Sequence, residues 1–319
     1  MVRFLFWRLV QSVVVLWVVY TVTFALLMLA PGDPFIGEKK PPESVLKALA
    51  AEYGLVPRSE RLNYTAAEDV VYFSRVYWRY LSRACVGDLG PSIQYENWKV
   101  TEVIGTSLPV SATLGCVALL VALVGGVAAG VSGAVRKNKW QDLVLTVVTL
   151  LGISLPTFVV GALLLMAFVV FVPIFPSGGW GTPQQIVLPA VTLALFFLAY
   201  IARLSRTSTL DVLGADFVRT ARAKGLSPRE VISRHVGANA GLPILSYIGP
   251  AAANVLTGSF VVEKIFNVPG LGTHFVNGCL NLDIPLVLGS VMMYTVLVVV
   301  FSLLVDVAYA AVDPRISLT

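Results

Sequence analysis

At the centre of residues 204–241 the chain reads Phe217-Val218-Arg219-Thr220-Ala221-Arg222-Ala223-Lys224-Gly225-Leu226-Ser227-Pro228-Arg229-Glu230. This segment is polar, and apolar runs long enough to cross a membrane lie on both sides of it. Its pattern is typical of a helix, a glycine and a second helix. We therefore expect a folded cytosolic loop that binds a soluble partner. An ordinary solvated loop is the alternative.

The charges of this segment indicate where its first helix begins and ends. Asp211 and Asp216 are placed to favour the start of the helix, and the basic residues Arg219, Arg222 and Lys224 favour its end. Both placements suit the helix dipole, which attracts anions at the first turn and cations at the last.

Glycine and proline supply the remaining start and stop signals. Gly225 stands where a left-handed C-terminal cap is expected. Ser227 and Glu230 have the spacing of a capping box, with Pro228 at the first helical position of the second helix. The sequence therefore predicts two short helices joined by a sharp turn.

Composition places the whole chain in a membrane. It is 57% hydrophobic and 13% charged, whereas a soluble domain has about 25% charged residues. The fold class that we predict is an all-α integral membrane protein. Its six apolar spans fall at roughly residues 9–30, 110–134, 143–172, 186–203, 243–262 and 285–311.

The first and second spans carry two further expectations. Residues 1–30 form an uncleaved anchor helix, because the apolar run is longer than the core of a cleaved signal peptide, which is the competing interpretation. Gly126 and Gly130 form a small-residue stripe that allows close helix packing, within this chain or against another.

Orientation follows from the distribution of basic residues. Arg136, Lys137, Lys139 and the basic residues of 204–241 fall in loops on one side, and the two short loops on the other side carry only Lys264. Because basic loops face the cytosol, both termini are expected there. The net charge of +5 is explained by this topology, and no nucleic-acid partner is needed.

Residues 31–108 are too long for a simple connector and predict an external helical subdomain that is not an independent domain. Helices are expected at 43–53 and 67–84, and a short one at 101–108 ahead of a span that begins near Pro109. Arg75, Arg79 and Arg83 share one face of the second helix. This basic stripe is either a solvated face or a contact for lipid headgroups or an external protein. The membrane-spanning core would then be residues 109–319.

A search for chemistry finds no site in the sequence. No metal-binding spacing, phosphate loop or nucleophile motif is present, so we expect neither a catalytic residue nor a cofactor in this chain. The acidic residues Asp142, Glu263 and Asp306 lie near segment ends and are expected to be interfacial. No acidic residue falls near mid-membrane, where a proton-driven carrier would need one, so any such carrier would have to take its energy from elsewhere. Whether Cys85 and Cys279 form a disulfide stays open.

At this point a series of motifs resembles a known family. The motifs are Leu29-Ala30-Pro31-Gly32-Asp33-Pro34, Gly87-Asp88-Leu89-Gly90, Ser154-Leu155-Pro156-Thr157-Phe158, Phe217–Leu226, Val268-Pro269-Gly270-Leu271-Gly272 and Asp313-Pro314-Arg315. Taken in this order, they are similar to the B-type permease subunits of the ATP-binding-cassette dipeptide and oligopeptide importers. The resemblance covers nearly the whole chain, and it is strongest to the oligopeptide branch.

The resemblance implies a fold, a mechanism and a set of partners. The fold would be that of type I importer permeases. Partners would be a homologous C-type permease subunit, two ATPase subunits that hold ATP and Mg, an extracytoplasmic peptide-binding protein and membrane lipid. The cargo would be a peptide. The coupling loop would use Asp216, Phe217, Arg219, Thr220, Ala221, Lys224, Gly225, Ser227 and Glu230. Candidates for docking the binding protein are Arg75, Arg79, Arg83, Pro269 and Gly270.

The loop departs from the general signature of such permeases, Glu-Ala-Ala-x-x-x-Gly. The matching positions read Arg219, Thr220, Ala221 and Gly225, so the glutamate and first alanine are absent. Which side chain makes the main ATPase contact therefore stays open. Dipeptides, glutathione and nickel chelates are alternative cargoes, and an ion-coupled carrier is an alternative of another class. A membrane-embedded enzyme would need paired acids or a serine–histidine set, which the spans lack.

Overall fold

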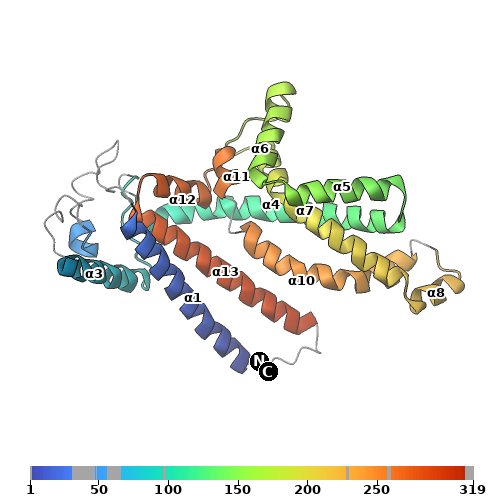
Figure 1. The fold of residues 1–319 in the computed structure, drawn as a ribbon, viewed down its shortest axis with the longest axis horizontal. Coiled ribbons are helices and arrows are strands. Elements are labelled where there is room, and N and C mark those ends of the chain that lie inside the picture. The colour runs from blue at the N-terminus through green and yellow to red at the C-terminus, as the bar shows by residue number, and fades with distance from the viewer. Residues whose placement is uncertain are drawn as a thin grey trace. The chain divides into compact units, whose positions relative to one another are not determined.

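The computed structural model describes the backbone of residues 2–30, 47, 49–55, 66–95, 98–227, 230–256 and 260–312. Over these ranges the chain is helical, and an isolated bridge between Pro91 and Lys99 is its one extended pairing. Figure 1 shows the order of the helices along the chain. The chain divides into two compact units, residues 1–111 with 269–300 and 315–319, and residues 112–268 with 301–314. Each unit is described by itself.

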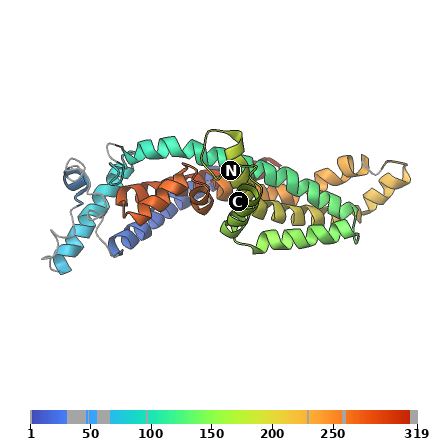
Figure 2. The same cartoon turned by 90° about the horizontal axis from the view of Figure 1, so that it is seen from above.

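The first unit holds the N-terminal helix and the described part of residues 31–108, which keeps the name external segment from the sequence-based expectation. Its elements are α1 (Val2–Leu29), the π-helix η1 (Leu49–Tyr53), α3 (Ala66–Ala84), the first part of α4 (Val100–Val135), α12 (Leu271–Leu280) and most of α13 (Ile284–Val312). In both views α1 and α13 run alongside each other (Figure 1 and Figure 2). The helix predicted at 67–84 is confirmed as α3.

An aromatic cluster forms the core of this unit. Tyr20 and Phe24 of α1 pack with Tyr53, Tyr72 and Tyr80, and the start of α13 contributes apolar side chains to the same cluster. The rings of Tyr53 and Tyr80 have centroids 5.4 Å apart, within the range of favourable aromatic pairs. The buried Tyr80 hydroxyl donates to the carbonyl oxygens of Leu89 and Pro285, each at 3.1 Å. The external segment is therefore packed onto the helices instead of projecting from them.

Asp283 fastens the segment around residues 92–94 to the start of α13. Its carboxylate is fully buried and accepts hydrogen bonds from the Ser92 hydroxyl at 2.5 Å and from the Ile93 and Gln94 amides at 2.9 and 3.0 Å. The Leu286 amide also donates to it at 3.1 Å, so Asp283 caps the helix as well. Burial raises the pKa of Asp283, and these hydrogen bonds act against that increase.

The second unit is built on α7 (Pro183–Leu213). The helices α5 (Trp140–Ser154), α6 (Thr157–Leu165) and α10 (Gly237–Leu256) pack against it, and α11 (Phe260–Ile265) packs on α6 and α7. The π-helix η3 (Met166–Phe171) continues α6. The short helices α8 (Asp216–Ala223) and the π-helix η4 (Val231–Val236) lie between α7 and α10 in the chain.

The glycine stripe of α4 packs against α7 of the same chain. A Cβ added at Gly126 would lie 2.9 Å from the Ile201 Cβ, and one at Gly130 would lie 2.6 Å from the Ser205 Cβ. Both distances are shorter than van der Waals contact, so only glycine allows the two backbones to approach this closely. This settles the choice left open by the sequence in favour of packing within the subunit.

Nearby, Asp142 of α5 forms a bidentate ion pair with Arg206 of α7. The Arg206 Nε lies 2.5 Å from the Asp142 Oδ1, and Nη2 lies 2.8 Å from Oδ2. The Asp142 carboxylate also accepts from the Asn138 amide at 3.0 Å. The interfacial position expected for Asp142 is thus used to join two helices, and the side chain is buried.

The predicted spans need correction. Within the described residues four helical stretches are long and apolar enough to cross a membrane: Phe6–Leu29, Val100–Val135, Pro183–Leu213 and Ile284–Leu304. The single span predicted at 143–172 is wrong in form, because its two halves are bent by 109° at a break around Leu155 and Pro156. Counting that bent pair as one span gives five, and the sixth, predicted at 243–262, is not confirmed.

Two boundaries also differ from expectation. The short helix predicted at 101–108 is continuous with the second span, since α4 runs through Pro109 without a break. The fourth span does not end near residue 203, because α7 extends to Leu213. The motifs at Pro31–Pro34 and Asp313–Arg315, much of the helix predicted at 43–53, and the residues Pro228 and Arg229 lie outside the described residues.

Candidate functional site

The loop between α7 and α10 folds around a small apolar core of its own. Val218 and Ala221 of α8 are buried, and they pack with Val231, Val236 and Ala240 from the segment that follows. Val218 and Ala221 are three residues apart, so they lie on one face of α8. The loop is therefore a folded helical pair, and the solvated-loop alternative is wrong.

The turn between the two helices has the geometry that the sequence predicted. Gly225 has φ of +83°, the left-handed conformation that favours glycine. Its amide donates to the Arg222 carbonyl at 3.0 Å, and the Leu226 amide donates to Ala221 at 3.4 Å, which closes the end of α8. A residue with a Cβ at position 225 would strain the backbone because of this φ, although no atom lies within 4 Å of the added Cβ.

The capping box of the second helix is also confirmed. The Ser227 amide donates to the Glu230 carboxylate at 3.0 Å, and the Glu230 amide donates to the Ser227 Oγ at 3.4 Å. The hydrogen bonds from the Ser227 hydroxyl and amide lower the pKa of Glu230, which lies exposed. Ser227 and Glu230 thus fix the start of the helix.

The opposite face of α8 is exposed and basic. Phe217 is 45% exposed, and Thr220, Arg222 and Lys224 are exposed as well. Arg219 lies 3.6 Å from Asp216 in an open pair, which contributes little stability. This face therefore offers a partner an aromatic ring surrounded by cations. Such a surface suits a groove of another protein with acidic residues at its rim.

One expectation about this loop is wrong in detail. Asp211 does not begin the first helix, because it lies in the last turn of α7, and α8 begins at Asp216. Ala221 is on the buried face and 5% exposed, so it supports the loop from within and offers no side chain to a partner. Hydrophobic periodicity over so short a helix could have indicated this, since Val218 and Ala221 are its apolar positions.

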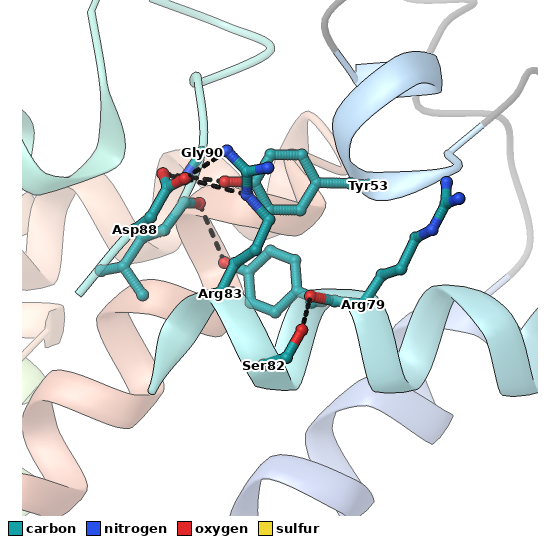
Figure 3. Close-up of polar contacts among 8 residues, drawn as sticks. Tyr53, Arg79, Ser82, Arg83, Asp88 and Gly90 are labelled. Carbon is teal, nitrogen blue, oxygen red and sulfur yellow. Dashed lines mark hydrogen bonds and ion pairs between the residues drawn. The ribbon is translucent and has the colours of Figure 1, made fainter. Parts of the chain in front are cut away.

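In the external segment, Arg83 is engaged inside the protein (Figure 3). Its Nε and Nη2 donate to the Asp88 Oδ2, at 2.9 and 2.5 Å, and its guanidinium lies 4.9 Å from the centre of the Tyr53 ring. The Tyr53 hydroxyl donates to the Asp88 Oδ1 at 2.9 Å. Burial raises the pKa of Asp88, but the hydrogen bonds from Tyr53, Arg83 and Gly90 outweigh it and lower the pKa overall.

The five predicted docking residues are therefore not equivalent. Arg75 and Arg79 are exposed on α3, whereas Arg83 is held by Asp88 and Tyr53. Pro269 is exposed, but Gly270 is buried as the residue before α12. A basic stripe in a sequence does not reveal which of its cations has an internal partner, and the pairing with Asp88 was missed for that reason.

Other groups that could do chemistry are scarce. In the part of the chain that the structure describes, no cluster of three metal-ligating side chains is found. Cys85, Cys116 and Cys279 are all free and exposed, so the disulfide left open between Cys85 and Cys279 is not formed. Asp283, whose carboxylate accepts four hydrogen bonds, carries no motif that could have singled it out.

Long apolar helices together with a folded polar loop define a multi-pass membrane protein. Comparison with known proteins places it more narrowly. Residues 122–318 match the family described as binding-protein-dependent transport system inner membrane component. The chain belongs to this family, and its resemblance to importer permeases is confirmed.

Individual relatives match over almost the full length. The chain is 40% identical over 318 residues to the oligopeptide transport system permease protein OppB of Salmonella typhimurium, covering 99% of both chains. It is 38% identical to OppB of Haemophilus influenzae, again with 99% of both covered. It is also 38% identical over 313 residues to the dipeptide transport system permease protein DppB of Bacillus subtilis, covering 98% of this chain and 96% of the relative.

Proposed function

We propose that this chain is the B-type permease subunit of an ATP-binding-cassette importer of oligopeptides in a prokaryotic cytoplasmic membrane. It would form half of the translocation pathway, with a homologous C-type permease as the other half. Two separate ATPase subunits would bind ATP and Mg, and an extracytoplasmic binding protein would deliver the peptide. The chain itself would carry no catalytic residue.

The observation that carries the coupling role is the packing of α8. Its buried face is fixed by Val218 and Ala221, and its two ends are fixed by Gly225 and by the capping box of Ser227 and Glu230. A helix held in this way moves as one body with α7 and α10. Its exposed face, Phe217 with Arg219, Thr220 and Lys224, is then available to the ATPase.

Replacing Phe217 with Ala tests this assignment. Burial of an aromatic anchor at an interface commonly supplies the largest share of its affinity, so we expect ATPase retention to weaken by about ten-fold or more. The measurement is the amount of ATPase that co-purifies with the tagged chain, together with peptide uptake. The matched control is Trp98→Ala, an aromatic residue of similar exposure (46%) in the external segment. The role of α8 would be contradicted if both variants lose the same amount of ATPase, or if neither variant loses any.

Oligopeptides are favoured as cargo by the OppB relatives and by the oligopeptide-branch motifs. The similarity to DppB of Bacillus subtilis makes dipeptides the second candidate. Uptake measured with peptides of two to six residues, with the cognate binding protein present, separates the two. Transport by the purified chain alone, driven by an ion gradient, would instead favour a carrier of another class.

For the external side we propose that Arg75 and Arg79 of α3 contact the binding protein, with Pro269 as a further contact. Their exposure supports this role, and the engagement of Arg83 with Asp88 argues against including it. Charge reversal at Arg75 should weaken binding-protein affinity and make it less sensitive to salt. Orientation with both termini in the cytosol rests on the basic residues that flank α5 and α8.

A further inference from the structure

A cavity of about 330 Å³ lies between α5 and α7 in the second unit. The α5 wall is mainly apolar, with Leu145, Leu150 and Ile153 beside Thr146 and Thr149, and the α7 wall presents Arg203, Arg206 and Thr207. The cavity therefore combines a hydrocarbon-lined part with a cationic part, and its size is within the range of small-ligand sites.

The charge within this cavity is not balanced. Arg206 is neutralised by Asp142 through two hydrogen bonds. Arg203 is exposed one turn before Arg206 on α7, and among the described residues no hydrogen bond or ion pair reaches its guanidinium. A cation between apolar helices that has no counter-ion from its own chain needs an anion or water from outside.

The position along α5 identifies the kind of anion. Trp140 begins this helix, is 71% exposed and follows the basic turn of Arg136, Lys137 and Lys139, a combination typical of the membrane–water interface. Thr146 then lies about 9 Å and Ile153 about 20 Å further along the helix axis. The cationic part of the cavity is thus near headgroup depth, and its apolar part reaches acyl-chain depth.

We propose that this cavity binds one anionic phospholipid, with the phosphodiester beside Arg203 and the start of an acyl chain along Leu150 and Ile153. In the structure the Thr207 hydroxyl donates to the Arg203 carbonyl oxygen, and the Thr146 hydroxyl donates to the Asp142 carbonyl oxygen. Either can turn to donate to a phosphate oxygen. The bound lipid supplies the missing negative charge and fills the groove between the two helices. The inference requires only that α5 and α7 lie in the bilayer, so it does not depend on the cargo.

The test is performed on the full complex in nanodiscs made from equal amounts of phosphatidylglycerol and phosphatidylcholine. Lipid retained after delipidation is identified by native mass spectrometry. The wild-type complex should retain phosphatidylglycerol preferentially, and Arg203→Gln should lower the ratio of the two retained lipids about five-fold, because one interfacial arginine contributes about that much to anionic-lipid binding. Arg203→Lys, which keeps the charge, should retain most of the preference.

Arg136→Gln is the matched control. It removes one positive charge at the same end of α5, but Arg136 is outside the cavity and is bonded to Ser132. The Arg136→Gln complex should prefer phosphatidylglycerol as strongly as the wild-type complex does. Three results would overturn the proposal: no preference in the wild-type complex, which means that a partner subunit covers the cavity; equal loss in both glutamine variants; or displacement of the lipid by millimolar inorganic phosphate, which means that the site takes a free anion.

Discussion

At the scale of single residues, the external segment depends on which cations and carboxylates find partners. Arg79 and Arg83 lie one turn apart on α3, yet only Arg83 meets Asp88 and the Tyr53 ring (Figure 3). We expect Arg83→Gln to destabilise this segment by about 1 kcal/mol, since an ion pair with two hydrogen bonds and a cation–π contact are lost from a partly exposed site. Arg79→Gln is the matched control and should have almost no effect. The measurement is limited proteolysis of the segment in detergent. If both variants resist the protease equally well, Arg83 and Arg79 do not have different roles in stabilising the segment.

Asp88 makes the same site sensitive to acid. Its pKa in the folded protein lies below its usual value of 3.8, so the carboxylate is ionised in the folded state at a lower pH than in the unfolded chain. The stabilisation is therefore complete above the ordinary pKa and is lost as the pH falls through the lowered one. Hydrogen exchange at the Gly90 amide, which donates to Asp88 at 3.2 Å, reports on this. After correction for intrinsic rates, protection in the wild type should stay constant down to about pH 4 and fall as the pH decreases further. A pH response that persists in Asp88→Asn would assign the effect to another group.

At the scale of helices, the close approach of α4 and α7 depends on glycine. Gly126→Val places atoms where the Ile201 side chain and the Leu198 carbonyl already lie, each 2.9 Å from an added Cβ. We expect a loss of stability of about 1–3 kcal/mol, the usual range for overpacking. Gly105→Ala in the same helix meets nothing within 4 Å and should be neutral or slightly stabilising, because alanine favours the helix. Thermal unfolding of the two variants in detergent compares them, and an equal loss would indicate a general effect of replacing glycine in α4.

Elements that depend on neighbouring residues were predictable, and those that depend on distant contacts were not. The left-handed Gly225, the capping box at Ser227 and the extent of α3 each follow from signals within a few residues. The link that Asp283 makes to residues 92–94 needs partners about 190 residues away in the chain. The bend after α5 falls between these cases. Leu155 is extended ahead of Pro156, with φ of −81° and ψ of 130°, as proline favours, but the apolar run on either side outweighed this signal in the expected span.

At the scale of the whole molecule, the bent pair α5 and α6 with η3 decides on which side α8 lies. If the pair crosses the membrane, the loop after η3 lies opposite the α4–α5 turn, and α7 returns the chain so that α8 lies on the same side as that turn. If the pair is a re-entrant hairpin, the loop after η3 lies beside the turn, and α7 carries α8 to the far side. Coupling to a cytosolic ATPase requires the first arrangement, because the basic turn of Arg136, Lys137 and Lys139 indicates the cytosolic side.

Single cysteines distinguish the two arrangements. With Cys85, Cys116 and Cys279 replaced by serine, the variants Lys137→Cys, Ser177→Cys and Lys224→Cys are labelled in intact cells with a thiol reagent that does not cross membranes. We expect only Ser177→Cys to react from outside, whereas Lys137→Cys and Lys224→Cys should react only after the cells are opened. Lys137 and Lys224 are exposed in the structure, so lack of access to the thiol cannot explain their protection in intact cells. Labelling of Lys224→Cys from outside would place α8 beyond the reach of any ATPase and remove the physical basis of the proposed coupling.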